Sequence, residues 1–257
     1  LVVKIARPDG GSPLFPIDPV AEACAGRFLS HHSLCPPPRA FFRVGPDHVL
    51  VYDFVPPVGA VRDRDLAACL ARLHGLSPAI LRERPPLRYR PRRHGSFHPV
   101  LLAAGRAHLE ASGWSAARLS QLDRAVTAAL DTPPAPARLL HGDPVPANAV
   151  AAASGTLLID WQCVHLGDPA RDLAIATSPA MRVVYGPCAS PTCGAPLLAA
   201  YPYWAVVTRF RRQKIAFHLQ MIGHCVWRAR AGHAAFASAL GFEIAALVAD
   251  LGADPKA

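Results

Sequence analysis

Apolar and polar residues alternate over short stretches near the start of the chain and recur at helical spacing over most of the remainder. Short apolar runs at 1–6, 41–44 and 49–54 are bounded by Gly and Pro turn signals, which predicts strands. From about residue 60 onward, apolar positions recur every three or four residues, which predicts helices. The pattern therefore indicates a small strand-rich region followed by a larger helical region. We expect helices over 18–31, 63–76, 98–111, 115–130, 169–178, 195–200, 204–230 and 233–251.

One more pair of strands is expected inside the helical region. Ser154-Gly155 is a turn signal between two apolar runs, so 147–161 is predicted to form a hairpin. Pro144 excludes continued helix in the loop before it. Such a hairpin would bring Asn148 and Asp160 close together.

The segment around this hairpin carries candidate chemistry. In RLLHGDPVPANAVAAASGTLLIDWQCVHLGDPARDL, Asp143 follows His-Gly, Asn148 comes five residues later, and Asp160 comes twelve residues after that. In phosphoryl transfer one Asp accepts the proton of the attacking hydroxyl, while an Asn and a second Asp hold Mg²⁺, which prefers oxygen ligands. The alternative is that these are ordinary polar turn residues. Asp168 fits that alternative in part, because Gly-Asp-Pro marks a helix start.

The same segment resembles the aminoglycoside phosphotransferase and choline kinase family, small-molecule relatives of the protein kinases. The matching pieces are LLHGD at 139–143, Asn148, LLIDW at 157–161 and GDPARDLA at 167–174. Their order and short spacing carry the resemblance, and no single piece would. In this family Asp172 would pin the catalytic loop.

The resemblance implies an α+β, protein-kinase-like bilobal fold. The N-terminal nucleotide-binding lobe would occupy 1–56 and be truncated. A large, mostly helical C-terminal lobe for catalysis and substrate would occupy 57–257. The family normally has two strands and a phosphate-covering turn before the lysine strand, whereas this sequence opens three residues before Lys4. We therefore expect either a fragment or a reduced lobe, and favour a fragment.

The resemblance also assigns cofactors and their ligands. Asp143 would be the catalytic residue, and Asn148 and Asp160 would bind Mg²⁺. Lys4 would contact the ATP phosphates, with Glu22 as its ion-pair partner. The bland alternatives are a lysine on an edge strand and a first-turn glutamate favoured by the helix dipole.

The run VLVYDFVPP at 49–57 resembles the hinge that receives adenine. Backbone groups near Asp53 and Val55 would bond the purine edge, and Tyr52 would flank the pocket. The alternative is that Val49–Phe54 is merely a core strand.

Charge is distributed unevenly along the chain, whose formal net charge is +9. Residues 138–172 hold four Asp against two Arg, which suits a magnesium site. The basic stretch RERPPLRYRPRRHG at 82–95 could bind nucleic acid or form a solvated Arg/Pro loop. No nucleic-acid motif accompanies it, so we expect no nucleic-acid partner.

The acceptor is less defined by the sequence. Residues 173–257 hold three acids against eight Lys and Arg, which disfavours a polycationic aminoglycoside. Aromatic residues of this region could form a cage for a quaternary ammonium, or could be core residues. Its arginines would suit an anionic or sugar-like acceptor. The aromatic residues are Tyr185, Tyr201, Tyr203, Trp204, Phe210 and Trp227, and the arginines are Arg182, Arg209, Arg211 and Arg212.

The cysteines and the ends of the chain bear on the compartment. Seven Cys show no C-x-x-C pair, the start lacks the features of a signal peptide, and no run of 18 apolar residues occurs. We expect reduced thiols, a cytoplasmic location and no membrane partner, although Cys188 and Cys193 could pair or bind metal.

The functional prediction is an ATP-dependent phosphotransferase that moves the γ-phosphoryl group to a hydroxyl of a small molecule other than an aminoglycoside. The alternative is a catalytically silent, kinase-fold module that binds a nucleotide or another ligand. A protein kinase is disfavoured, because no activation segment with Ala-Pro-Glu follows Asp160.

Overall fold

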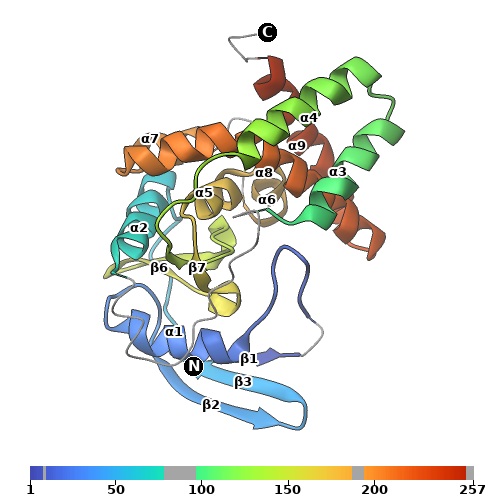
Figure 1. The fold of residues 1–257 in the computed structure, drawn as a ribbon. Helices are drawn as coiled ribbons and strands as arrows, with labels where there is room; N and C mark the ends of the chain where they lie inside the picture. The colour runs from blue at the N-terminus through green and yellow to red at the C-terminus, as the bar shows by residue number, and fades with distance from the viewer. Residues whose placement is uncertain (8–9, 78–96, 187–193, 253–257) are drawn as a thin grey trace.

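The computed structural model describes residues 1–7, 10–77, 97–186 and 194–252. A small lobe with a three-stranded sheet and one helix lies beside a larger, mostly helical lobe (Figure 1). In chain order the elements are β1 (Val2–Ala6), α1 (Pro19–Ser30), β2 (Pro38–Val44), β3 (Asp47–Tyr52), α2 (Asp63–Gly75), α3 (Pro99–Ala111), α4 (Ala116–Leu130), β4 (Arg138–Leu140), η2 (Pro146–Asn148), β5 (Ala149–Ala152), β6 (Gly155–Leu158), η3 (Trp161–Cys163), β7 (His165–Gly167), α5 (Ala170–Thr177), α6 (Pro179–Tyr185), α7 (Ala195–Ala200), α8 (Trp204–Arg230) and α9 (Ala234–Gly252).

The sheet of the small lobe is antiparallel, with the strand order β1-β3-β2. Successive side chains of a strand point to opposite faces. In β1, Val3 and Ile5 are exposed, whereas Lys4 between them is turned inward, opposite Leu50 of β3. The alternation therefore delivers Lys4 to the face of the sheet that α1 covers.

Helix α1 starts as its sequence predicts. Pro19 occupies the first turn, where its missing N–H costs nothing, and the Asp18 side chain accepts a hydrogen bond of 3.0 Å from Ala21 N. The helix also contacts η3 of the large lobe. Its start is thus anchored where the two lobes meet, and Glu22 lies in that first turn.

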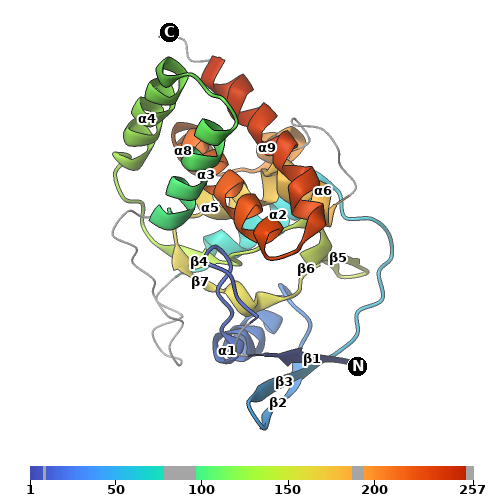
Figure 2. The ribbon, with the colours of Figure 1, turned by 90° about the vertical axis from the view of Figure 1, so that its right-hand side faces the viewer.

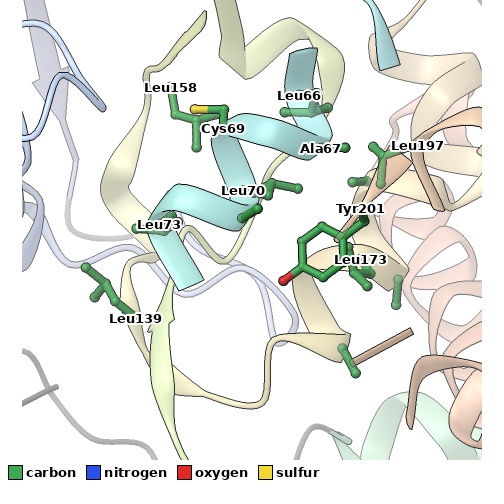
Figure 3. Packing of buried hydrophobic residues seen from close by; sticks show 14 of the residues in the cluster. Leu66, Ala67, Cys69, Leu70, Leu73, Leu139, Leu158, Leu173, Leu197 and Tyr201 are labelled. Atoms are coloured by element: carbon green, nitrogen blue, oxygen red, sulfur yellow. The ribbon is translucent and has the colours of Figure 1, made fainter. Parts of the chain in front are cut away.

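Helix α2 forms the apolar centre that connects the two strand pairs of the large lobe to its helices (Figure 3). Leu66, Leu70 and Leu73, the predicted apolar face, are each at most 1% exposed. They pack with residues of β4, β6, α5 and α7. Complete burial of a leucine side chain contributes about 1.5–3 kcal/mol. This packing fixes β4 and β6, from whose ends the site loops project.

Helix α8 is the axis of the helical lobe, and α3, α4, α5 and α9 pack against it (Figure 2). It approaches α3 so closely that a Cβ at Gly223 would lie 1.9 Å from the Leu101 carbonyl oxygen. Glycine at this position is therefore a packing requirement rather than a turn signal.

Helix α9 is the one helix of the described residues that is long and apolar enough to cross a membrane, judged by length and composition alone. A third of its apolar window is buried in the structure, where it packs against α8 and α6. Its inward face carries the buried carboxylate of Glu243. A core helix of a globular protein meets the same criterion, so this is weak evidence for a membrane span.

The predicted elements are present, with ends shifted by up to three residues, except around residues 165–185. The helix expected over 169–178 is confirmed as α5, but a second helix, α6, follows it directly and was missed. Two helices, α5 and α6, occupy this region, because the Ser178 hydroxyl caps α6 through Met181 N and Pro179 cannot continue α5. The pairing of β4 with β7 was also missed. The basic stretch at 82–95, Cys188 and Cys193 lie outside the described residues.

Candidate active site

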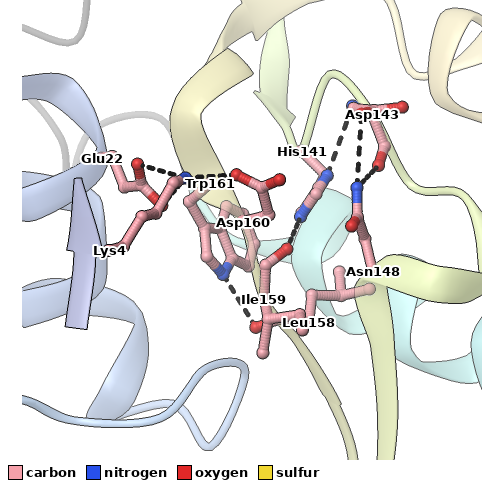
Figure 4. Close-up of polar contacts among 9 residues, drawn as sticks. All are labelled: Lys4, Glu22, His141, Asp143, Asn148, Leu158, Ile159, Asp160 and Trp161. Carbon is pink, nitrogen blue, oxygen red and sulfur yellow. Dashed lines mark hydrogen bonds and ion pairs between the residues drawn. The ribbon is translucent and has the colours of Figure 1, made fainter. Parts of the chain in front are cut away.

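Three chain segments meet between the lobes: the loop after β4, the end of the β5–β6 hairpin, and β1 with α1 (Figure 4). The hairpin pairs Ala149 with Leu158, as predicted. Because its two strands are adjacent, Asn148 before the first and Asp160 after the second are held at one end of the hairpin. The Ile159 amide donates to the Asn148 carbonyl at 2.9 Å, which fixes that end.

Lys4 connects the small lobe to the hairpin. Its Nζ donates at 2.8 Å to each carboxylate oxygen of Glu22, so the predicted ion pair is present. The same Nζ also donates to Asp160 Oδ1. Burial lowers the pKa of Lys4, but the two carboxylates more than offset this and hold it above its usual value. The lysine therefore stays charged and is held within reach of the Asp160 carboxylate.

Asp160 has an unusual backbone conformation. Its φ of 63° and ψ of 57° place it in the left-handed region, which is uncommon for residues other than glycine, although Asp and Asn tolerate it best. The Trp161 indole donates to the Leu158 carbonyl at 2.9 Å and fixes the turn on either side. This conformation places the Asp160 carboxylate, whose side chain is 33% exposed, between Lys4 and His141 (Figure 4).

Asp143 lies opposite, held by Asn148. The Asn148 Nδ2 donates to the backbone oxygen of Asp143 at 2.9 Å and to its Oδ2 at 3.3 Å. The other carboxylate oxygen, Oδ1, is buried and has no hydrogen-bond partner among the described residues. Burial, reinforced by the Asp160 charge, raises the pKa of Asp143 to about 7. An oxygen with no partner and a pKa near neutrality suits a proton acceptor.

His141 joins this loop to the strand that ends at Asp160. Its Nδ1 accepts from Asp143 N at 3.3 Å, which leaves Nε2 to donate to the Ile159 carbonyl at 2.9 Å. Burial lowers its pKa, so the neutral form that this pattern requires is favoured. One buried imidazole thus sets the spacing between the two aspartates.

Asp172 holds the same loop, which follows β4, through its backbone amides. Its carboxylate accepts from His141 N at 2.8 Å and from Gly142 N at 3.0 Å. His74 Nε2 contacts it at 3.1 Å, and His74 Nδ1 contacts the Tyr201 hydroxyl at 2.7 Å. Burial alone would raise the pKa of Asp172, but these hydrogen bonds keep it below its usual value. The prediction that Asp172 pins the loop is confirmed, whereas His74 and Tyr201 had no sequence signal.

The three predicted hinge residues, Tyr52, Asp53 and Val55, have different surroundings. Tyr52 ends β3, and Val55 lines a cavity of about 490 Å³ that continues to Pro146 and Ala147 of the loop. The Asp53 carboxylate instead pairs with Arg39 at 2.7–2.8 Å. The Asp53 amide donates to the Pro37 carbonyl at 3.3 Å, so this N–H group is used within the protein.

Several other predicted residues have structural roles. Asp168 accepts from Ala170 N at 3.0 Å and pairs with Arg209 at 2.6 Å, so it holds the start of α5, as the alternative interpretation expected. Arg182 is buried against the Ala176 carbonyl and Asp63. The guanidinium of Arg211 lies over the Trp204 ring. The suggestion that Arg182, Arg209 and Arg211 recognise an acceptor is therefore wrong, because their guanidinium groups contact neighbouring protein groups.

The aromatic cage is also not formed. Tyr201 and Phe210 are core residues at most 5% exposed, and Tyr203 packs edge-on against Tyr201. Trp204 is 67% exposed at the start of α8. The core alternative describes most of this set. Tyr185 differs, because it lines the same cavity as Val55 and Pro146.

The donors of the cleft fit one type of metal. No group of three or more His, Cys, Asp and Glu side chains in the described part of the chain could hold an ion alone. The cleft instead offers the Asp160 carboxylate and the Asn148 amide oxygen, both hard oxygen donors. Mg²⁺ is usually held by one or two carboxylates together with phosphate oxygens and water. These residues therefore fit a magnesium ion that arrives with a nucleotide.

Comparisons with known proteins agree with this geometry. The family model described as "Phosphotransferase enzyme family" matches residues 1–210. No curated protein sequence matches significantly.

Solved structures share the fold at low sequence identity. A choline/ethanolamine kinase family protein from Mesorhizobium loti is 18% identical, with a TM-score of 0.60 over 93% of this chain and 80% of that one. Choline kinase LicA from Streptococcus pneumoniae is 14% identical, with a TM-score of 0.59 over 96% and 86%. A spectinomycin phosphotransferase in complex with ADP and spectinomycin is 15% identical, with a TM-score of 0.54 over 98% and 84%.

Proposed function

The chain belongs to the phosphotransferase enzyme family, and on this premise we propose that it transfers the γ-phosphoryl group of ATP to a hydroxyl group of a small molecule. One observation carries the proposal. The partnerless Asp143 Oδ1 and the Asp160 carboxylate belong to segments that one buried imidazole links, because His141 accepts from Asp143 N and donates to the carbonyl of Ile159, the residue before Asp160. A general base and a metal ligand must share one site in this reaction.

Each residue has a separate task in this proposal. Asp160 and Asn148 would hold Mg²⁺, which supplies charge neutralisation of the phosphates when bound. Lys4 would exchange its contact with Asp160 for the phosphates while Glu22 keeps it oriented. Asp143 Oδ1 would take the proton of the acceptor hydroxyl as that oxygen attacks the γ-phosphorus, and ADP would leave on the opposite side.

The cavity between hinge and loop supports ATP as the donor. Val55, at the hinge, and Val150 of β5 lie on its wall. The Asp53 carbonyl and the Val55 amide would bond the adenine edge, with Tyr52 beside it. This assignment divides the chain into a nucleotide-binding lobe over 1–56 and a catalytic lobe over 57–257, with the cavity at their junction.

The acceptor that we propose is not an aminoglycoside, because the helical lobe is basic and would repel a polycation. We also propose a cytoplasmic location, where ATP is supplied. The five cysteines of the described residues are free thiols, which is consistent with that compartment.

The catalytically silent binding module remains the competing proposal. It predicts nucleotide binding with no transfer to any acceptor. The buried, partnerless oxygen of Asp143 favours the enzyme, because an unsatisfied buried carboxylate oxygen is costly unless it has a use.

The test is an ATP-consumption screen against hydroxylated metabolites, including choline and kanamycin, combined with a magnesium-dependent nucleotide titration. We expect nucleotide binding, turnover of at least one hydroxylated metabolite, and no turnover of kanamycin. Nucleotide binding with no acceptor turned over would support the silent module. Rapid phosphorylation of kanamycin would refute the charge argument.

A further inference from the structure

The last turn of α8 brings an arginine to the edge of the proposed active site. Arg228 is partly buried, and its guanidinium lies 5.2 Å from the centre of the Phe236 ring of α9. The Tyr185 ring packs edge-on against the same Phe236 ring at 6.0 Å. Figure 2 shows the turn between α8 and α9 on the side of the helical lobe that faces the small lobe. Neither of these two aromatic rings carries a charge that could pair with Arg228.

Two other arginines of the helical lobe have carboxylate partners. Arg182 pairs with Asp63 at 2.7 Å, and Arg209 pairs with Asp168 at 2.6 Å. Arg228 has no carboxylate partner among the described residues. Its charge is not used to tune the proposed base either, because the charged side chains that act most strongly on Asp143 are Asp160, Asp172 and Arg171. A partly buried charge without an opposite charge is unfavourable unless a ligand provides it.

Tyr185 connects this arginine to the reacting groups. It ends α6, and it lines the cavity together with Pro146 and Ala147, which lie between Asp143 and Asn148. The next residue, Gly186, lies so close that a Cβ there would be 3.2 Å from the Pro146 ring. Tyr185 therefore adjoins both the Phe236 ring against which Arg228 packs and the loop that carries the proposed base.

Aromatic side chains pack behind Arg228, and one of them, His224, has a ring nitrogen without a hydrogen bond among the described residues. His224, one helical turn before Arg228, packs edge-on against Phe236 at 5.4 Å and Phe15 at 5.0 Å. Its Nδ1 is buried without a partner in the described part of the chain. Burial, with a further contribution from Arg228, lowers the pKa of His224 to about 3, so the ring is neutral. Since His224 is neutral, the positive charge beside the Phe236 ring is that of Arg228.

We propose, on the basis of the phosphotransferase function above, that Arg228 and Tyr185 bind an anionic group of the acceptor, so that the substrate is a hydroxylated small molecule carrying a carboxylate or a phosphate. A guanidinium presents five N–H donors in a planar fork. Packing over the Phe236 ring leaves these donors free for a bidentate contact with such a group. The hydroxyl of the same molecule would then face Asp143.

The test measures binding of four probes to the full chain with ATP analogue and Mg²⁺ present. D-Glycerate and glycerol 3-phosphate carry the two candidate anions, glycerol is the neutral match, and choline is the cationic one. We expect the anions to bind better than glycerol and choline. In Arg228→Gln this binding should weaken by about 10- to 100-fold, the range for a charge-assisted hydrogen bond. Arg228→Lys should restore part of it.

Arg211→Gln is the matched control, because Arg211 is also on α8 but lies over the exposed Trp204 ring. It should leave anion binding unchanged. The proposal is overturned if glycerol or choline binds as well as the acids, if no anion binds, or if Arg228→Gln binds them normally. Nucleotide binding is measured separately in each variant. If the wild type binds no nucleotide, the phosphotransferase function is refuted. If it binds nucleotide but shows no preference for anionic probes, only the proposed acceptor class is refuted.

Discussion

Two buried clusters of charge share one plan, a cation between two carboxylates, but they are assembled differently. One lies in the cleft between the lobes and the other lies between two helices of the large lobe. The cleft cluster is Lys4, Glu22 and Asp160, and the helix cluster is His218, Glu243 and Asp250.

The helix cluster is locally complete. His218 of α8 contacts Glu243 at 2.6 Å and Asp250 at 2.9 Å, both from α9. The remaining oxygen of Glu243 accepts from the Ser178 hydroxyl at 2.7 Å and from Ala180 N at 3.0 Å. The two carboxylates thus hold His218 charged and join α6, α8 and α9. Each of their four oxygens already accepts a hydrogen bond within the protein, since Lys214 donates to the remaining oxygen of Asp250 at 2.7 Å.

The cleft cluster joins segments far apart in sequence and is not complete. Lys4 and Asp160 are 156 residues apart and come from different lobes. Asp160 keeps an oxygen that Lys4 does not use and a left-handed backbone. The comparison teaches that charge pairing alone does not mark a site. The cluster with an unused oxygen, an unusual backbone and contributions from two lobes is the one suited to exchange a partner for a ligand.

The largest expected effect is on nucleotide binding. Asp160→Ala should abolish magnesium-dependent nucleotide binding, because the ion between the β- and γ-phosphates loses its anionic ligand. Asp160→Asn is the matched variant, since Asn tolerates the same left-handed backbone but lacks the charge. Titration of both with nucleotide and Mg²⁺ checks this. Wild-type affinity in either variant would remove Asp160 from the metal site.

The next effect separates binding from transfer. Asp143→Asn keeps the shape of the loop but removes the proton acceptor, so nucleotide binding should persist. Transfer should fall by on the order of 10²–10⁴-fold. The measurement is the rate of ADP release with an accepted substrate, beside the nucleotide dissociation constant. Full activity in this variant would mean that another residue is the base.

The helix cluster should respond in stability instead. Glu243→Ala removes one partner of the buried His218 charge and leaves Ser178 and Ala180 N unpaired. The free energy of unfolding should fall by about 3–5 kcal/mol, as for other broken buried ion pairs. Denaturant unfolding measures it, with Asp160→Ala as the comparison that should lose much less. Nucleotide binding by the folded fraction should be unchanged.

The smallest effect is a dependence of stability on pH. Burial lowers the pKa of His218, but its two carboxylates outweigh burial and raise it to about 9. A raised pKa contributes stability that is complete below the unfolded value near 6.5 and is lost as the pH rises through 9. The loss should be on the order of 3 kcal/mol. Unfolding curves from pH 7 to 10 should show this slope in the wild type and a flatter one in His218→Gln.

The sequence predicted the parts of the site that depend on local spacing. Asn148 and Asp160 flank a two-stranded hairpin, so a turn signal and two apolar runs were enough to bring them together. The Lys4–Glu22 pair was predicted from the resemblance, and the alternation of β1 explains why Lys4 points inward. The sequence also predicted a helix that ends at Ser178, before Pro179, but it did not predict the short helix α6 that follows.

The residues that hold or extend the site had no such local signal. His74 of α2 contacts Asp172, and Tyr201, which follows α7, contacts His74; neither has a spacing that marks it. The sequence suggested Arg182 and Arg211 for the acceptor and gave no reason to single out Arg228. Only the folded structure separates the three by their partners. Arg182 pairs with Asp63, Arg211 lies over the Trp204 ring, and Arg228 lies over the Phe236 ring.

The sequence by itself therefore determined which elements form and which oxygen and nitrogen groups could carry phosphoryl transfer, because hydrophobic periodicity and turn residues act over a few neighbours. Only the tertiary structure decided which charges are satisfied by the protein and which are left for a ligand. Burial and charge compensation depend on groups that are distant along the chain, such as Lys4 and Asp160, and only the packing of the two lobes brings them into contact.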